Sequence, residues 1–357
     1  MLTNQSTTSV EQLQHVAEAA VAGKQVLAAG EWRSALSELA IHLQRPMSLS
    51  STERVERVLK AYLRAIFRLQ LAGDDARFIA KWQRDLGFLL KFKSYGVKCA
   101  TPLGYSLFFQ NPGEGFSFQR HLTHKTEIFC ILKPLDGALV FLCSSNDWES
   151  LYDRCGFQRW LNGARDANLA KFATRPCPGD VYHVSELGVI HSVLGCILEE
   201  FATVSTDMVD RLHDQNAGRN EPQVARDAVV TRLRNLGASA PRIAASDGKP
   251  AGVIVHDGDV LSYRLGTGAI DATRVHMTRA RVEVRAHTLR ARILFTVKGS
   301  ASCIIRGNGD SPGVTPPAID VRGGDLLMIA PGFDALIATR DAAVFSIHAI
   351  EPEIALV

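Results

Sequence analysis

The stretch GFSFQRHLTHKTEIFCILKPLDG, residues 115–137, places histidines and a glutamate among strand-forming residues. Five residues separate Gly115 from His121, and His124 and Glu127 follow shortly afterwards. Aromatic and β-branched residues favour strands, and the Pro-Gly and Asp-Gly pairs around this stretch favour turns. The stretch therefore predicts a β domain with histidines and a carboxylate on or next to its strands.

A second stretch, PGDVYHVSELGVIHSV at residues 178–193, opens on a Pro-Gly-Asp turn and carries His191 near its end. Imidazoles and a carboxylate that come together from two separate hairpins suit a borderline divalent ion such as Fe²⁺, Mn²⁺, Zn²⁺ or Ni²⁺. The two stretches together predict one such ion per chain, with ligands drawn from His121, His124, Glu127 and His191.

The two stretches resemble the two motifs of the cupin family, whose members fold as jelly-roll barrels, also called double-stranded β-helices. The first family motif runs Gly, five residues, His-x-His, three or four residues, Glu, six residues, Gly; the second carries Pro-x-Gly and a distal His. The match covers residues 101–215, but here the spacing is His-x-x-His, so Thr123 stands at the second histidine's position. Because strand side chains alternate between faces, His121 and His124 both point inward only if a bulge or a strand end intervenes.

The remainder of the chain indicates a helical leader and a second β domain. Apolar residues recur at intervals of three and four in residues 55–67, as in an amphipathic helix. Strand-like runs such as RILFTVKG and SCIIRG follow residue 251. We expect a mainly β fold with a helical N-terminal region and two cupin-type barrels, arranged as a helical region at 1–98, a metal-binding barrel at 99–216, a helix and connector at 217–250, and a second barrel at 251–357.

The second barrel lacks the metal-binding residue types. When RVEVRAHTLRARILFTVKG is aligned with the first cupin motif, Arg285 lies near the first histidine position and Arg292 takes the place of the glutamate. Phe333 and Asp334 stand where the distal histidine should lie. Arginine is not deprotonated in proteins, so it cannot hold a cation. We therefore expect a bicupin whose C-terminal barrel is degenerate and metal-free.

The segment LEEFATVSTDMVDRLHDQNAGR, which begins at Leu198, is dense in polar residues. It resembles sugar-isomerase-like and mannose-6-phosphate-isomerase-like cupins. The resemblance implies isomerisation or epimerisation of a sugar, sugar phosphate or hydroxy-acid through a metal-stabilised enediolate, which needs a group that moves a proton. The candidates for proton transfer are Glu200, Lys125 and His183, and those for substrate binding are Arg211, Asp214 and Thr203.

The same ligand types leave two other functions open. Two histidines and one carboxylate also form the open face of Fe(II)-dependent dioxygenases. A non-catalytic sugar-binding bicupin is the third possibility. Dependence on Fe(II) with consumption of oxygen would indicate the dioxygenase, and an unchanged substrate would indicate the binding protein.

The composition argues against several classes of protein. Forty basic and thirty-seven acidic residues leave a charge of +3, and no Lys/Arg run suits a nucleic-acid backbone. The N-terminus lacks signal-peptide features, and the seven cysteines include no Cys-x-x-Cys pair. We expect a cytoplasmic enzyme with a small-molecule substrate and no nucleic-acid or membrane partner. The resemblance to cupins that associate through sheet edges adds the expectation of a homodimer.

Overall fold

The computed structural model describes residues 31–350 with internal gaps. The gaps are 44–48, 68, 87, 94, 145, 148–166, 185–186, 204–208, 214–230, 232–234, 236–251, 267–269, 308–309 and 312. Asp214 and nearly all of the predicted helix and connector at 217–250 therefore lie outside the described residues.

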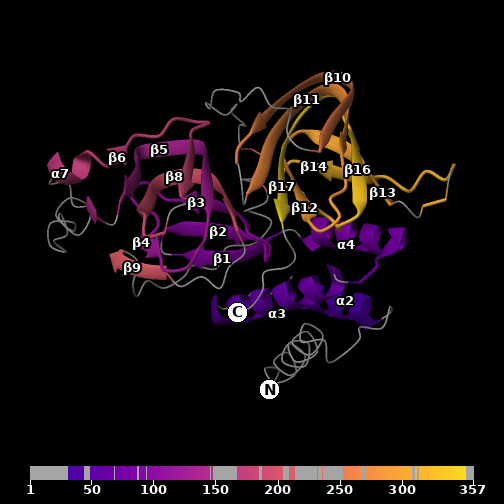
Figure 1. Cartoon of the computed structure of the whole chain (residues 1–357), viewed down its shortest axis with the longest axis horizontal. Helices are drawn as coiled ribbons and strands as arrows, with labels where there is room; N and C mark the ends of the chain where they lie inside the picture. Colours follow the sequence, from indigo (N-terminus) through magenta and orange to yellow (C-terminus); the bar gives the residue numbers. More distant parts are fainter. Residues whose placement is uncertain are drawn as a thin grey trace.

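Helices come first in the described chain: α2 (Glu31–Leu43), α3 (Leu49–Phe67) and α4 (Gly73–Leu86). The apolar stripe of α3 is buried, as its spacing predicts, and it contributes Val55, Leu59 and Ile66 to the main core. In Figure 1 the helices lie along one side of two β barrels, where α3 contacts strand β1 (Leu89–Lys93). Among the described residues, no helix has the length and apolar character needed to cross a membrane.

Barrel 1 is built from the strands between residues 89 and 213, with the short helix α7 (Ala167–Ala170) between two of them. Its sheet order is β1-β2-β3-β8-β4-β9, and β5 pairs with β6, β7 and β8. The strands are β1, β2 (Gly96–Ala100), β3 (Tyr105–Gln110), β4 (Phe118–His121), β5 (Glu127–Cys143), β6 (Ala173–Thr174), β7 (Val181–Val184), β8 (Ile190–Ala202) and β9 (Val209–His213).

A long ribbon of β5 and β8 belongs to both layers of barrel 1. The two strands pair from Glu127 opposite Ala202 at one end to Cys143 opposite Ile190 at the other. A register shift in β5 lies opposite Gly195, whose φ of 61° suits a sharp bend. Strands β3 and β7 pair with the half that carries Glu127, and β4 and β6 pair with the other half. We call these halves the Glu127 layer and the His191 layer. Apolar side chains from both layers pack together in one cluster, which we call the interior cluster.

Barrel 2 has its strands in the order β14-β13-β16-β11-β17-β12-β15, with β10 paired to β11 (Figure 1). The expected mainly β fold with two barrels and a helical N-terminal region is thus confirmed. The strands are β10 (Val253–Arg264), β11 (Asp271–Val284), β12 (Ala291–Lys298), β13 (Ser300–Gly307), β14 (Ile319–Arg322), β15 (Leu326–Ile329), β16 (Phe333–Ala338) and β17 (Ala342–Ile350).

The first strands of barrel 1 begin inside the stretch 1–98 that was expected to be helical. The sequences LLKFK and GVKCA of β1 and β2 alternate apolar residues with lysine, which is the period of a strand. Such short strands are easily taken as a continuation of the preceding helices, because strand and helix patterns overlap over five residues.

The two barrels share a buried polar contact that we call the inter-barrel network. It consists of Tyr105 and Glu199 from barrel 1 and Arg274 and Ser346 from barrel 2. Arg274 forms an ion pair with Glu199, and both side chains are fully buried. The hydroxyls of Tyr105 and Ser346 each donate to Glu199 Oε1 at 2.6 Å. The network fixes β8 of barrel 1 against β11 and β17 of barrel 2.

The glycine that opens the first motif lies where the backbone of β8 passes closely. A Cβ atom added to Gly115 would lie 2.7 Å from the Cα atom of Leu194 and closer still to the Val193 carbonyl oxygen. We expect Gly115→Ala to lower the free energy of unfolding by about 3 kcal/mol in urea denaturation. Gly137→Ala is the matched control: its φ is 72° with no atom within 4 Å, so only backbone strain of about 1 kcal/mol applies. Equal losses in both variants would contradict the close approach.

Candidate metal centre

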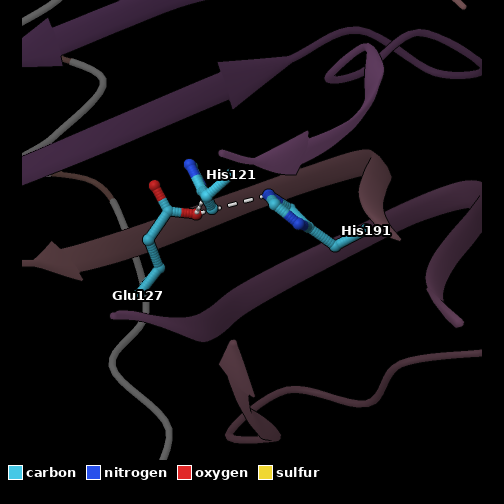
Figure 2. Close-up of side chains that lie close together, drawn as sticks. All are labelled: His121, Glu127 and His191. Atoms are coloured by element: carbon cyan, nitrogen blue, oxygen red, sulfur yellow. Dashed lines mark ion pairs between the residues drawn. The ribbon is translucent and has the colours of Figure 1, made fainter. Parts of the chain in front are cut away.

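Three side chains converge inside barrel 1: His121 from the end of β4, Glu127 from the start of β5 and His191 from β8 (Figure 2). Glu127 Oε2 lies 3.2 Å from His121 Nε2 and 3.4 Å from His191 Nε2. One ligand atom from each residue can be chosen so that all lie within 4.8 Å of one another. The predicted convergence of the two motifs is therefore present for these residues.

The layered ribbon explains how residues so far apart in sequence meet. His121 and His191 belong to the same layer, because β4 pairs with β8 at Gln119 opposite His191. Their rings stack with centroids 5.0 Å apart. Glu127 belongs to the other layer and reaches the imidazoles across the barrel interior. The bend in the β5–β8 ribbon is thus what assembles the group.

The group is buried and carries a charge that suits a cation. The side chains of His121 and Glu127 are each 2% exposed, and His191 is also buried. Burial raises the pKa of Glu127, but the Lys125 ammonium, 2.5 Å from Glu127 Oε1, and the two imidazoles hold it well below its usual value. Glu127 is therefore ionised at neutral pH, which is the form that binds a metal ion.

The donor atoms fit a divalent ion. Among the described residues, Glu127 Oε2 is buried and accepts no hydrogen bond of regular geometry, which is costly unless another partner is present. The Nδ1 atom of His191 lies 3.2 Å from the Val189 carbonyl oxygen, which can only accept. In the neutral ring Nδ1 then carries the proton and Nε2 faces the group with its lone pair. Two imidazole nitrogens and a carboxylate oxygen match the requirements of Fe, Mn, Ni or Zn.

His124 does not join this group. Its side chain is exposed, and it lies in the connection after β4 ends at His121. Thr123, which stands at the family's second histidine position, has a buried hydroxyl oxygen, whereas the side chain of His124, one residue further on, is exposed. We leave His124 out of the proposed ligand set, which then contains His121, Glu127 and His191.

Glu200 faces the interior beside His121, Glu127 and His191, which we call the metal group. It lies opposite Phe129 in the β5–β8 ribbon, and the Phe129 ring belongs to the interior cluster. Glu127 pairs with Ala202, so Glu200 is its diagonal neighbour at roughly 7–8 Å between backbones. The residue is 7% exposed. Glu200 is therefore an ionisable group that is placed to act near the metal centre.

The other predicted site residues that the structure describes differ in which face of the sheet they occupy. His183 is exposed and pairs with Ile128, so it points to the opposite face of the sheet from Phe129 and the site. Thr203 exchanges hydrogen bonds with Thr126 at 3.0 Å, which ties two strand ends together. Arg211 pairs with Gln119, which also pairs with His191, so the register places exposed Arg211 on the same sheet face as His191. The structure therefore does not bring His183 or Thr203 to the metal group, whereas Arg211 lies on the site's side of the sheet.

Lys98 was not singled out from the sequence, although it lies 3.6 Å from Glu200 through its Nζ atom. Its Nζ atom also lies 4.6 Å from the centroid of the Phe108 ring, which belongs to the interior cluster. The sequence feature that could have indicated Lys98 is the lysine between apolar residues in GVKCA, because this alternation is typical of a strand with a charged residue on one face.

Barrel 2 has an arginine at the equivalent strand position. Arg292 pairs with Ala349 of β17, just as Glu127 pairs with Ala202 of β8. Arg292 is buried, and burial is the main cause that lowers its pKa. Within the part of the chain that the structure describes, the His121, Glu127 and His191 group is the one set of its kind. The expected absence of a metal site in barrel 2 stays a prediction.

Comparison with known proteins gives a likeness in architecture only. No protein-family model matches the chain. No curated protein sequence matches it either. Procruciferin, an 11S globulin from Brassica napus, shares 12% identity over 74% of this chain and 82% of its own, with a TM-score of 0.44.

Two enzyme structures show a similar level of likeness. An oxalate decarboxylase shares 12% identity over 75% of this chain and 76% of its own, with a TM-score of 0.44. Mannose 6-phosphate isomerase from Bacillus subtilis shares 14% identity over 68% of this chain and 74% of its own, with a TM-score of 0.42. At such scores no activity carries over, and the function has to be argued from the site.

Proposed function

We propose that this bicupin is a metal-dependent enzyme that isomerises or epimerises a small polar substrate: a sugar, a sugar phosphate or a hydroxy-acid. The buried group of His121, Glu127 and His191 is the observation that carries the proposal. A divalent ion bound there would act as a Lewis acid that polarises a carbonyl oxygen and acidifies the neighbouring C–H bond. Three protein ligands leave coordination positions for substrate oxygens.

The protein's own residues supply the other requirements of such a reaction. Glu200 is the carboxylate in the interior that the metal group does not use, so we assign to it the removal and return of the carbon-bound proton. Lys125 keeps Glu127 ionised through its contact with Oε1. Burial of the histidines limits access of bulk water to the reacting atoms.

The direct test is proton exchange at carbon. Protein loaded with Mn²⁺, Zn²⁺, Ni²⁺ or Fe²⁺ is incubated without oxygen in D₂O with aldoses, ketoses, their phosphates and hydroxy-acids. We expect NMR to show deuterium at the carbon next to the carbonyl and formation of the isomer for one substrate class. Unchanged substrates with every metal would contradict the proposal and favour a non-catalytic sugar-binding protein.

One observation favours a second candidate, an Fe(II)-dependent dioxygenase. With His124 exposed, the proposed ligands are two histidines and one carboxylate, which is the set of non-haem iron oxygenases. Oxygen consumption that requires Fe²⁺ and substrate would support this candidate. We rank it second because it gives no role to Glu200, the additional carboxylate beside the metal group.

A further inference from the structure

Lysines extend the charged surface of the barrel interior away from the metal group. Strands β1 and β2 continue the Glu127 layer beyond β3, with Lys91 opposite Lys98 and Lys98 opposite Phe108. Since paired residues share a face and the Phe108 ring belongs to the interior cluster, both lysines lie on the interior face. The ammonium of Lys98 contacts Glu200, the proposed proton-transfer residue, at 3.6 Å.

Helix α3 adds two more charges at the edge of this layer. Glu56 forms an ion pair with Lys91, and both side chains are largely buried, at 14% and 11% exposure. Lys60 lies one helical turn further on and forms no ion pair among the described residues. We call Lys60, Lys91 and Lys98 the cationic cluster.

The cationic cluster has more positive than negative charge. Its three ammonium groups face two carboxylates, Glu56 and Glu200. Burial lowers the pKa of Lys60, and the nearby cations Lys91 and Lys98 lower it further, while Glu56 opposes them. Partly buried charge without a counter-ion is unfavourable for folding. The fold therefore carries a cost here that a bound anion would remove.

The position of the cationic cluster indicates which molecule would carry the bound anion. Glu200 lies between the cluster and the metal group, because its carboxylate contacts Lys98 while Glu127 is its diagonal neighbour on the same face of the β5–β8 ribbon. A small molecule held at the metal by one end would therefore extend past Glu200 toward Lys98.

We propose that the cationic cluster binds an anionic group of the substrate, a phosphate ester or a carboxylate, while the metal centre holds the carbonyl end. The placement of the carbonyl end rests on the proposed function. Anion binding itself does not, since it can be measured in the absence of metal.

The test uses inorganic phosphate and glycolate as probes in isothermal titration calorimetry of the whole chain, with and without Zn²⁺. We expect at least one of the probes to bind to the metal-free chain, and the stronger one to identify the anionic group. Lys60→Met and Lys98→Met should each weaken this binding by about tenfold, the loss of one charge-assisted contact. Lys93→Met is the matched control, because Lys93 lies on β1 but faces Glu53 at 4.0 Å, and we expect less than about a twofold change.

The outcomes separate the two proposals. Weaker anion binding in both variants, with Zn²⁺ content unchanged, supports the cationic cluster as the anion site. Affinity that is unaltered in both variants, or no binding of either probe to the unmodified chain, overturns it. Anion binding that depends on Lys60 and Lys98 in a chain that takes up no metal would overturn the proposed function and leave the anion site standing.

Discussion

Replacing Arg274 with methionine lowers the free energy of unfolding by about 3–5 kcal/mol, because the Glu199 carboxylate is then buried without its cation. Both side chains of this ion pair are fully buried between the barrels. The hydroxyls of Tyr105 and Ser346 still donate to Glu199, but they do not neutralise its charge. Urea denaturation of the whole chain measures the loss, and the midpoint should fall.

Two controls make the Arg274 result specific. The double variant Glu199→Gln, Arg274→Met should recover much of the lost stability, because it removes both buried charges together. Arg33→Met breaks an ion pair with Asp75 in which the Arg33 side chain is 40% exposed, so it should cost less than about 1 kcal/mol. If Arg274→Met costs no more than Arg33→Met, the inter-barrel network does not stabilise the fold as argued.

Glu200→Gln should lower turnover by about 10²–10⁴-fold on the substrate that shows proton exchange, because an amide cannot take up the carbon-bound proton. Metal content should be unchanged, since Glu200 is not one of the proposed ligands. Steady-state rates and deuterium exchange measure the effect, and metal analysis of the same sample confirms that the centre is intact.

His183→Asn is the matched control for Glu200. The sequence also names His183 as a candidate for proton transfer, but its side chain is exposed on the other face of the sheet. Its replacement should leave turnover within about twofold, as expected for a surface substitution. Full activity in Glu200→Gln would assign the proton transfer to another group.

His121, Glu127 and His191 could be proposed from the sequence because each lies in a short motif with a fixed internal spacing. His121 and Glu127 lie at either side of one connection, and His191 follows a recognisable turn. The alignment with the first cupin motif already placed Arg292 at the glutamate position, and the structure puts it at the strand position that corresponds to Glu127. These features need no knowledge of how the strands pair.

The face to which each remaining site residue points depends on strand register, which the sequence does not specify. A shift of one residue moves a side chain to the other face, so His183 could not be told from its inward-facing neighbours. Lys98 was missed because β2 begins before residue 99, where the first barrel was expected to start. The cytoplasmic location and the homodimer stay predictions.

The most direct test of the central claim is the metal content of three proteins purified without added metal and then dialysed against Zn²⁺ or Mn²⁺. Elemental analysis should find one ion per chain in the unmodified protein and almost none in His191→Ala. His287→Ala should match the unmodified protein, because the Nδ1 atom of His287 accepts hydrogen bonds from the Leu289 and Arg290 amides in barrel 2. No ion in the unmodified chain, or equal loss in both variants, would contradict a metal centre inside barrel 1.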